Sequence, residues 1–227
     1  MRLVAFGCSN TYGQALPDVW DQEKNEDTFN QKTLVHNGPS KYAWPEILAN
    51  KLNIECVNNG FSGASNKEIW YNILCTTFYK DDIVIILWPY FERYCFIQKN
   101  KIKQLGTWMT TDPTYPNYEQ SKAFFKYFYD EYDMLLDFYL RVNHIQTFLQ
   151  DKVELIKHSM VKRPQINFRE LGFVSHLFHW NKIKHNLYMS DFIEQYLPKA
   201  LDNGHPGTNA HKAFATAIYD EIKDEIT

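Results

Sequence analysis

The chain has 227 residues and a formal net charge of -3 at pH 7, with 44% hydrophobic and 22% charged residues. This balance predicts one globular domain with a real core, and it excludes a disordered chain and a protein that binds nucleic acid through bulk charge. No apolar run approaches the ~20 residues that span a bilayer, and the amino terminus lacks the pattern of a signal peptide. We therefore expect a cytoplasmic protein without a membrane span.

The first predicted element is a buried strand over residues 3–6, followed by a turn bracketed by Gly7 and Gly13. Ser9 lies in that turn, just past the carboxyl end of the strand, where open parallel sheets bind ligands. A hydroxyl there, beside glycines that let a substrate approach the backbone, is a candidate nucleophile. The alternative is a serine that caps the next helix. The neighbouring Cys8 is also a candidate nucleophile, but we favour a packing role for it, because cysteine is among the most buried residue types. The four cysteines form no Cys-x-x-Cys pair.

Helices and strands then alternate along the chain. A long polar loop is predicted over residues 18–41, helices over 43–52 and 67–79, and short strands over 54–57 and 153–156. Residues 82–88 are the clearest strand, because an unbroken apolar run is typical of the centre of a parallel sheet. The alternation predicts an α/β protein with a doubly wound, mostly parallel sheet between two helical layers.

The regularity breaks over residues 97–151, which we interpret as a helical insertion. Residues 96–118 have no regular pattern, whereas residues 119–150 predict one long helix outside the sheet layers. The helix carries more aromatic residues than one face can bury. We favour a helix with a thick apolar stripe that packs on the core. The alternative is a cap over the active site or a surface that joins two copies of the chain.

Residues 162–196 are hard to place, but they contain His176, His179 and His185. Two histidines at i and i+3 share a helix face, as metal ligands do. No cysteine and no second close pair of histidines completes a site, so the sequence predicts no metal.

Asp202 and His205 lie three residues apart in a turn before the last predicted helix, residues 208–226. A histidine that acts as a general base must be held in one tautomer, and a nearby carboxylate does this through the other ring nitrogen. Asp-x-x-His alone is a weak signal because chance produces it often. Together with Ser9 it supplies the three parts of a serine hydrolase.

Three segments together resemble the conserved blocks of the SGNH (GDSL-like) hydrolase family. Residues 7–13, GCSNTYG, are similar to its first block, with Cys8 where the family usually has Asp and Ser9 at the nucleophile. Residues 59–65, NGFSGAS, are similar to the second block, whose glycine N–H helps to form the oxyanion hole. Gly63 is the match to that glycine.

Residues 202–206, DNGHP, are similar to the last block of the family, which supplies the acid and the base. The resemblance implies a three-layer α/β/α, flavodoxin-like fold over a single domain of residues 1–227. It also implies that Ser9 is the nucleophile and not only a helix cap.

The third block departs from the family pattern. The family usually has Gly-x-Asn-Asp after the central strand, and the Asn side chain donates to the oxyanion. Here residues 88–93 read WPYFER, and an ungapped alignment places Tyr90 where that Asn would be. Tyr90, Asn66 and Arg93 are the candidates to replace it, and we expect Tyr90 to line the substrate pocket instead.

The resemblance implies an esterase that needs no metal or organic cofactor. We expect its substrate to be a small molecule or glycan that carries a small acyl group. The alternative is a binding or structural protein that keeps the fold but has lost efficient chemistry. A phosphate-binding domain fits poorly, because neither glycine turn matches a P-loop or a GxGxxG fingerprint.

Overall fold

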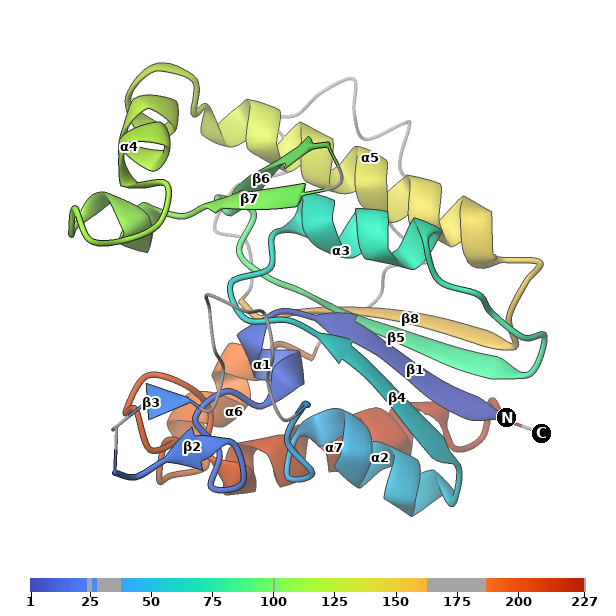
Figure 1. The fold of residues 1–227 in the computed structure, drawn as a ribbon. Helices are drawn as coiled ribbons and strands as arrows, with labels where there is room; N and C mark the ends of the chain where they lie inside the picture. Colours follow the sequence, from blue (N-terminus) through green and yellow to red (C-terminus); the bar gives the residue numbers. More distant parts are fainter. Residues whose placement is uncertain (24–25, 28–37, 100, 163–186, 227) are drawn as a thin grey trace.

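The computed structural model of the chain describes residues 1–23, 26–27, 38–99, 101–162 and 187–226 (Figure 1). Its central sheet has four parallel strands in the order β4-β1-β5-β8. Their bounds are Arg2–Gly7 for β1, Glu55–Gly60 for β4, Asp82–Trp88 for β5 and Leu155–Met160 for β8. Because β1 lies between the two strands that follow it in the chain, this is the order of a doubly wound sheet.

Helices cover both faces of the sheet (Figure 1). α3 and α5 lie on one face and contact each other, and α2 and α7 do the same on the other face. Their bounds are Asn66–Leu74 for α3, Glu131–Leu149 for α5, Trp44–Leu52 for α2 and Thr208–Ile222 for α7. The short helix α6, Met189–Gln195, packs on α7 through an edge-on contact of Phe192 and Phe214. The predicted three-layer α/β/α fold is confirmed.

The central strands are held by burial and by one charged pair. Every residue of β5 is buried, which explains why its sequence is apolar throughout. At the amino end of the sheet, the Arg2 guanidinium donates to both carboxylate oxygens of Asp82, at 2.9 and 2.7 Å. The Asp82 side chain is fully buried and also accepts from the Tyr79 N–H, so the pair fixes the start of two adjacent strands.

The aromatic stretch differs from its prediction in two respects. The expected single helix over residues 119–150 is two helices, α4 (Tyr118–Tyr127) and α5. Asp130 begins the second helix, because its carboxylate accepts from the Asp133 N–H at 3.0 Å. The prediction that this helix lies outside the sheet layers is also wrong for α5. Its buried side chains belong to the main core, and Phe138 meets Trp88 of β5 edge to face.

The part of the region that does project from the sandwich is shorter than predicted. Residues 96–118, expected to be irregular, contain a hairpin of β6 (Tyr94–Gln98) and β7 (Lys101–Leu105) and a 3-10 turn, Thr107–Thr110. The hairpin and α4 extend beyond the end of the sheet (Figure 1). The two most exposed aromatic residues of the described chain lie at the end of α4, with Tyr127 67% and Phe128 74% exposed. The segment that lies outside the three layers therefore ends with α4, and α5 is part of the sandwich.

The remaining boundaries shift by a few residues. β4 and β8 end three or four residues later than predicted, whereas α3 ends five and α7 four residues earlier. The predicted loop 18–41 contains a small antiparallel pair, β2 (Trp20–Asp21) and β3 (Glu26–Asp27). The three histidines considered as metal ligands lie outside the described residues. Within the described residues, no helix is long and apolar enough to cross a membrane.

Candidate active site

Ser9 stands at the edge of the sheet where the parallel strands end. It is the first residue of α1 (Ser9–Tyr12), a single helical turn that directly follows β1. The N–H groups at the start of a helix have no acceptor within the helix, so they can bind a negatively charged oxygen. Ser9 is buried, with 3% of its surface exposed, and its Oγ lies 3.9 Å from Cys8 Sγ.

The end of β4 fixes α1 through close backbone contact. A Cβ on Gly60 would lie 2.4 Å from the Tyr12 nitrogen, so only glycine lets the two segments approach. One side chain, Asn58, joins them: its Nδ2 donates to the Thr11 carbonyl at 2.8 Å, and its Oδ1 accepts from the Gly60 N–H at 2.9 Å. The turn that carries Ser9 is therefore held by hydrogen bonds on its neighbour strand.

Asp202 and His205 form a hydrogen-bonded pair within one turn. His205 Nδ1 and Asp202 Oδ2 are 2.5 Å apart, and Asp202 Oδ1 accepts from the N–H groups of Gly204 and His205 at 2.9 and 3.0 Å. Burial opposes ionisation of Asp202, but these hydrogen bonds outweigh it and lower its pKa to about 2. The carboxylate thus holds Nδ1 of the imidazole, which leaves Nε2 to accept a proton.

The turn with Asp202 and His205 is attached to the segment that follows α1. The Leu201 N–H donates to the Ala15 carbonyl at 3.1 Å, and Ala200 packs in a small apolar cluster with Tyr12 and Leu16. The structure thus brings the predicted acid and base to the same end of the sheet as Ser9. It shows no hydrogen bond between the described side chains of Ser9 and His205.

A hydrogen bond between α2 and α7 also stabilises the region that follows the turn with Asp202 and His205. His211, on the first turns of α7, is fully buried, and its Nδ1 accepts from the Trp44 N–H of α2 at 3.0 Å. Burial and the nearby His205 lower the pKa of His211 to about 3. A neutral His211 therefore ties the two helices of this layer together just after the turn with Asp202 and His205.

Gly63 lies in the turn between β4 and α3, the second predicted block. Its φ is +74°, in the left-handed region that favours glycine. The turn begins where the Phe61 N–H donates to the Gly7 carbonyl at 3.1 Å, which places it against the end of β1. Gly63 is therefore on the same edge of the sheet as Ser9.

Asn66 is the first residue of α3 and has an unusual environment. It is 4% exposed, and neither its Nδ2 nor its Oδ1 has a hydrogen-bond partner among the described residues. A buried polar group without a partner costs free energy, so such a group needs an explanation. Asn66 lies three residues after Gly63, so an unpaired amide is available next to the second block.

Tyr90 and Arg93 follow the end of β5. Tyr90 is half-buried, and burial raises its pKa, with the Arg93 cation opposing the rise and Cys8 adding to it. The Arg93 guanidinium lies over the rings of Tyr90 and Trp108, at 5.2 and 4.9 Å from the ring centroids. Its buried Nη1 has no hydrogen-bond partner in the part of the chain that the structure describes.

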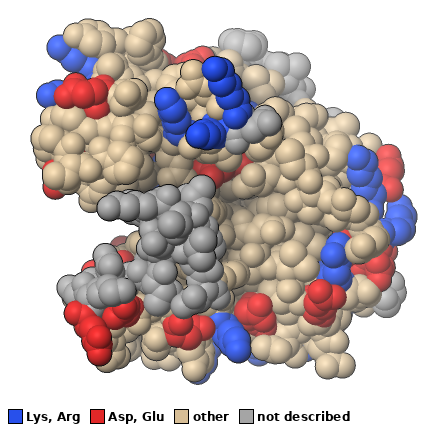
Figure 2. All heavy atoms as spheres, viewed as in Figure 1, with Lys and Arg blue, Asp and Glu red and all other residues tan. Residues whose placement is uncertain are grey.

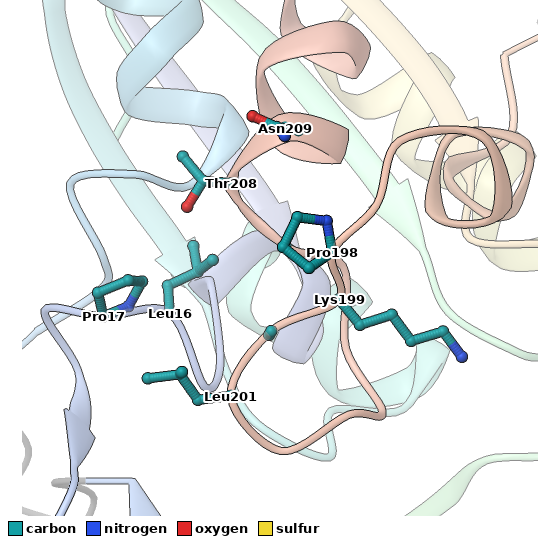
Figure 3. A pocket seen from close by; sticks show the side chains of 9 residues that line it. Leu16, Pro17, Pro198, Lys199, Leu201, Thr208 and Asn209 are labelled. Carbon is teal, nitrogen blue, oxygen red and sulfur yellow. The ribbon is translucent and has the colours of Figure 1, made fainter.

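Figure 2 shows a hollow at this end of the molecule, next to the part that carries α4. A separate pocket of about 300 Å³ lies beside the turn with Asp202 and His205 (Figure 3). Its lining is Leu16, Pro17, Pro198, Lys199, Ala200, Leu201, Gly207, Thr208 and Asn209. None of the predicted catalytic residues lines that pocket. Within the described residues, no group of three or more His, Cys, Asp or Glu could hold a metal ion.

Sequence reasoning missed three residues that shape the site. Asn58 and Gln104 act on the turns through side-chain amides, and Glu68 is a buried carboxylate on the first turn of α3. Gln104 lies in a hairpin that the sequence did not reveal. Asn58 was visible only as a polar residue after an apolar run, which is a weak sign of a bond to a neighbouring backbone.

The sequence matches no protein-family model and no curated protein. Two solved structures have a TM-score of 0.50 with this chain, each at 11% identity. One is a protein assigned to the lipolytic G-D-S-L family from Desulfitobacterium hafniense DCB-2, with 96% of this chain and 98% of that chain covered. The other is a carbohydrate esterase whose active site displays divergent catalytic and non-catalytic binding functions. The match covers 98% of this chain and 68% of that chain. Likeness at this identity establishes the fold.

Proposed function

Since the chain has the α/β/α fold of the SGNH (GDSL-like) hydrolases, we propose that it is a serine esterase that transfers an acyl group to water. The observation that carries the proposal is the pair of Asp202 and His205 at the strand ends. The carboxylate occupies one imidazole nitrogen and leaves the other to act as a base. The same edge of the sheet presents a serine at a helix start.

In the proposed mechanism, Ser9 Oγ attacks the carbonyl carbon of an ester while His205 Nε2 accepts its proton. The tetrahedral intermediate collapses, and the leaving alcohol takes that proton from His205. Water then repeats the attack on the acyl-enzyme and releases the acid. Asp202 stays ionised, because its pKa is about 2, and it stabilises the imidazolium form of His205.

The developing oxyanion needs donors that are already in place. We assign this role to the backbone N–H groups of Ser9 and Gly63, as the resemblance implies. Asn66 is the candidate for a third donor, because its amide is buried and unpaired. Tyr90 follows β5 where the family has Asn, and its contact with Arg93 supports a place in the pocket wall instead.

The substrate that we propose is a small acyl group on a carbohydrate or another polar carrier. The support is the fold shared with a carbohydrate esterase. Two expectations stay predictions. One is that the protein is cytoplasmic, and the other is that two copies join through the aromatic residues of the predicted helix 119–150.

A fluorophosphonate probe tests the proposal directly, because it reacts readily only with a serine activated by a base. We expect labelling at Ser9, turnover of short-chain nitrophenyl esters, and loss of both in Ser9→Ala. Ser190→Ala is a matched control, since Ser190 lies on α6, away from the proposed site, and its hydroxyl donates to the neighbouring Asp191 carboxylate at 3.4 Å. Labelling at Cys8 or at Ser62, or no labelling of the folded protein, would contradict the mechanism.

The second candidate function is a binding protein with little or no catalysis. Two observations favour it: Ser9 is buried, and no hydrogen bond joins it to His205. In this case acetylated oligosaccharides would bind without turnover, and Ser9→Ala would leave their affinity unchanged. Calorimetric titration with one acetylated oligosaccharide, run beside the esterase assay, separates the two functions.

A further inference from the structure

The hairpin of β6 and β7 touches the turn that contains Gly63 through one side chain. Gln104 Nε2 donates one hydrogen bond to the Ser62 carbonyl at 3.2 Å and another to Glu68 Oε2 at 2.9 Å. Both hydrogens of the amide nitrogen are therefore used. One bond holds the peptide that precedes Gly63, and the other holds the first turn of α3.

The rest of the same amide packs against Gly63 itself. A Cβ built on Gly63 would lie 2.7 Å from Gln104 Oε1 and 3.4 Å from Gln104 Cδ, the carbon of the side-chain amide. The amide of Gln104 therefore fills the space where a side chain of residue 63 would lie. With φ at +74°, the peptide of Gly63 has a conformation that few residues adopt, and its neighbour keeps it there.

Both sides of this contact are anchored. The Gln104 carbonyl accepts from Asn117 Nδ2 at 3.3 Å, which joins the hairpin to the start of α4. On the other side, Ser62 Oγ donates to Gln14 Oε1 at 2.7 Å, just after the helical turn that begins with Ser9. The turn is thus held between the projecting hairpin and the segment that carries the proposed nucleophile.

We propose that Gln104 is a positioning residue that fixes the Gly63 N–H in the direction needed to donate to the oxyanion. The inference rests on the proposed function, because it gives a role to an oxyanion donor of that mechanism. Donors contribute most when they are oriented before the reaction, and a displacement of ~1 Å can cost about 10²-fold in rate. The turn of residues 61–65 has no helix or strand of its own, so its orientation depends on such contacts.

Glu68 explains why an amide is suited to this position. It is 3% exposed, and burial raises its pKa, while the hydrogen bonds from Gln104 and from the Ser65 backbone oppose the rise. An amide can donate to this carboxyl and to a carbonyl at once. A carboxylate at position 104 has no hydrogen to donate and would repel Glu68.

The test uses Gln104→Met, which keeps the length of the side chain and removes its hydrogen bonds. Lys103→Met is the matched control, because Lys103 is its exposed neighbour on β7. Two measurements are made on the full chain: kcat and KM for a nitrophenyl ester, and amide hydrogen exchange of peptides that span residues 58–69. We expect Gln104→Met to lower kcat by about 10- to 100-fold with KM within a factor of two. Exchange in the turn should rise, and Lys103→Met should match the wild type.

Unchanged exchange in Gln104→Met would overturn the inference, whether or not the protein is an esterase. Faster exchange with unchanged kcat would overturn the catalytic half of it. If the wild type neither hydrolyses esters nor reacts with fluorophosphonate, the proposed function fails. Exchange alone then decides whether Gln104 fixes the turn.

Discussion

Replacing Asn66 by leucine should raise the stability of the protein while it lowers the rate of the reaction. The amide of Asn66 is buried, and neither of its polar atoms is paired. Leucine has a similar branched shape and nothing to leave unpaired. If Asn66 is kept for catalysis, its cost to the folded state and its benefit to the transition state should appear as opposite effects of one substitution.

The magnitudes follow from the two roles. A buried polar group without a partner costs about 1–3 kcal/mol, so Asn66→Leu should stabilise the fold by about 1–2 kcal/mol after the extra bulk is accommodated. Loss of an oxyanion donor costs ~10²–10³ in kcat, or about 2.7–4 kcal/mol of barrier. Neither effect should change KM much, because the donor acts mainly in the transition state.

Asn58→Leu is the matched control. Its amide is paired at both atoms, with the Thr11 carbonyl at 2.8 Å and the Gly60 N–H at 2.9 Å. Its replacement leaves both backbone groups unpaired and should destabilise the protein by roughly 2–4 kcal/mol. Urea unfolding and turnover of one nitrophenyl ester are measured for both variants. Equal destabilisation by the two would show that Asn66 is paired in solution. Turnover of Asn66→Leu within fivefold of the wild type would refute its role as a donor.

Three further predictions concern other parts of the molecule. Tyr90→Phe should keep kcat within about threefold, and a drop of ~100-fold in the same ester assay would instead assign the third donor to its hydroxyl. His211 should make the fold acid-sensitive: its pKa is lowered to about 3, so the unfolded chain binds this proton near pH 6.5 and the folded chain does not. The contribution of neutral His211 to the free energy of unfolding is therefore fully present above pH 6.5. It falls by up to about 1.4 kcal/mol per pH unit as the pH is lowered towards 3. His211→Gln should flatten this slope in urea unfolding at pH 7 and pH 4.5, and equal slopes would contradict the assignment. Asp82→Asn should cost roughly 3 kcal/mol in urea unfolding, because it leaves Arg2 without its buried partner. A loss below 1 kcal/mol would mean that the pair is solvated.

The elements that the sequence predicted well are those whose signal is local. β5 has the predicted bounds, because an unbroken apolar run ends at a proline. β4 extends beyond its apolar part into two asparagines. One of them, Asn58, donates a hydrogen bond to the Thr11 carbonyl of α1 and does not pack in the core. A hydrophobic pattern cannot show such an end, because the contact depends on a turn some 47 residues away along the chain.

The misassigned helix shows a different limit. A 3.6-residue repeat shows that a helix has an apolar face, but it does not show what covers that face. In α5 the stripe meets β5 through Phe138 and belongs to the sandwich, whereas the aromatic residues at the end of α4 stay exposed. The two sets follow each other without a gap in the pattern. Only the Asp130 cap separates them, and a single acidic residue is too common to mark a boundary.

The same contrast applies to the candidate site. Asp202 and His205 are three residues apart, so one turn brings them together and the sequence shows the pair. Gln104 reaches the Ser62 carbonyl across 42 residues and is one polar residue in a short strand. If Asn66 is the third donor, two of the three oxyanion donors lie on residues 63–66, the segment that Gln104 holds at both ends. In that case Asn66 replaces the Asn that the family usually has after β5, and the hairpin holds the turn that leads to Asn66. A site that draws two donors from one irregular turn depends on whatever fixes that turn, and here the β6–β7 hairpin supplies the contact.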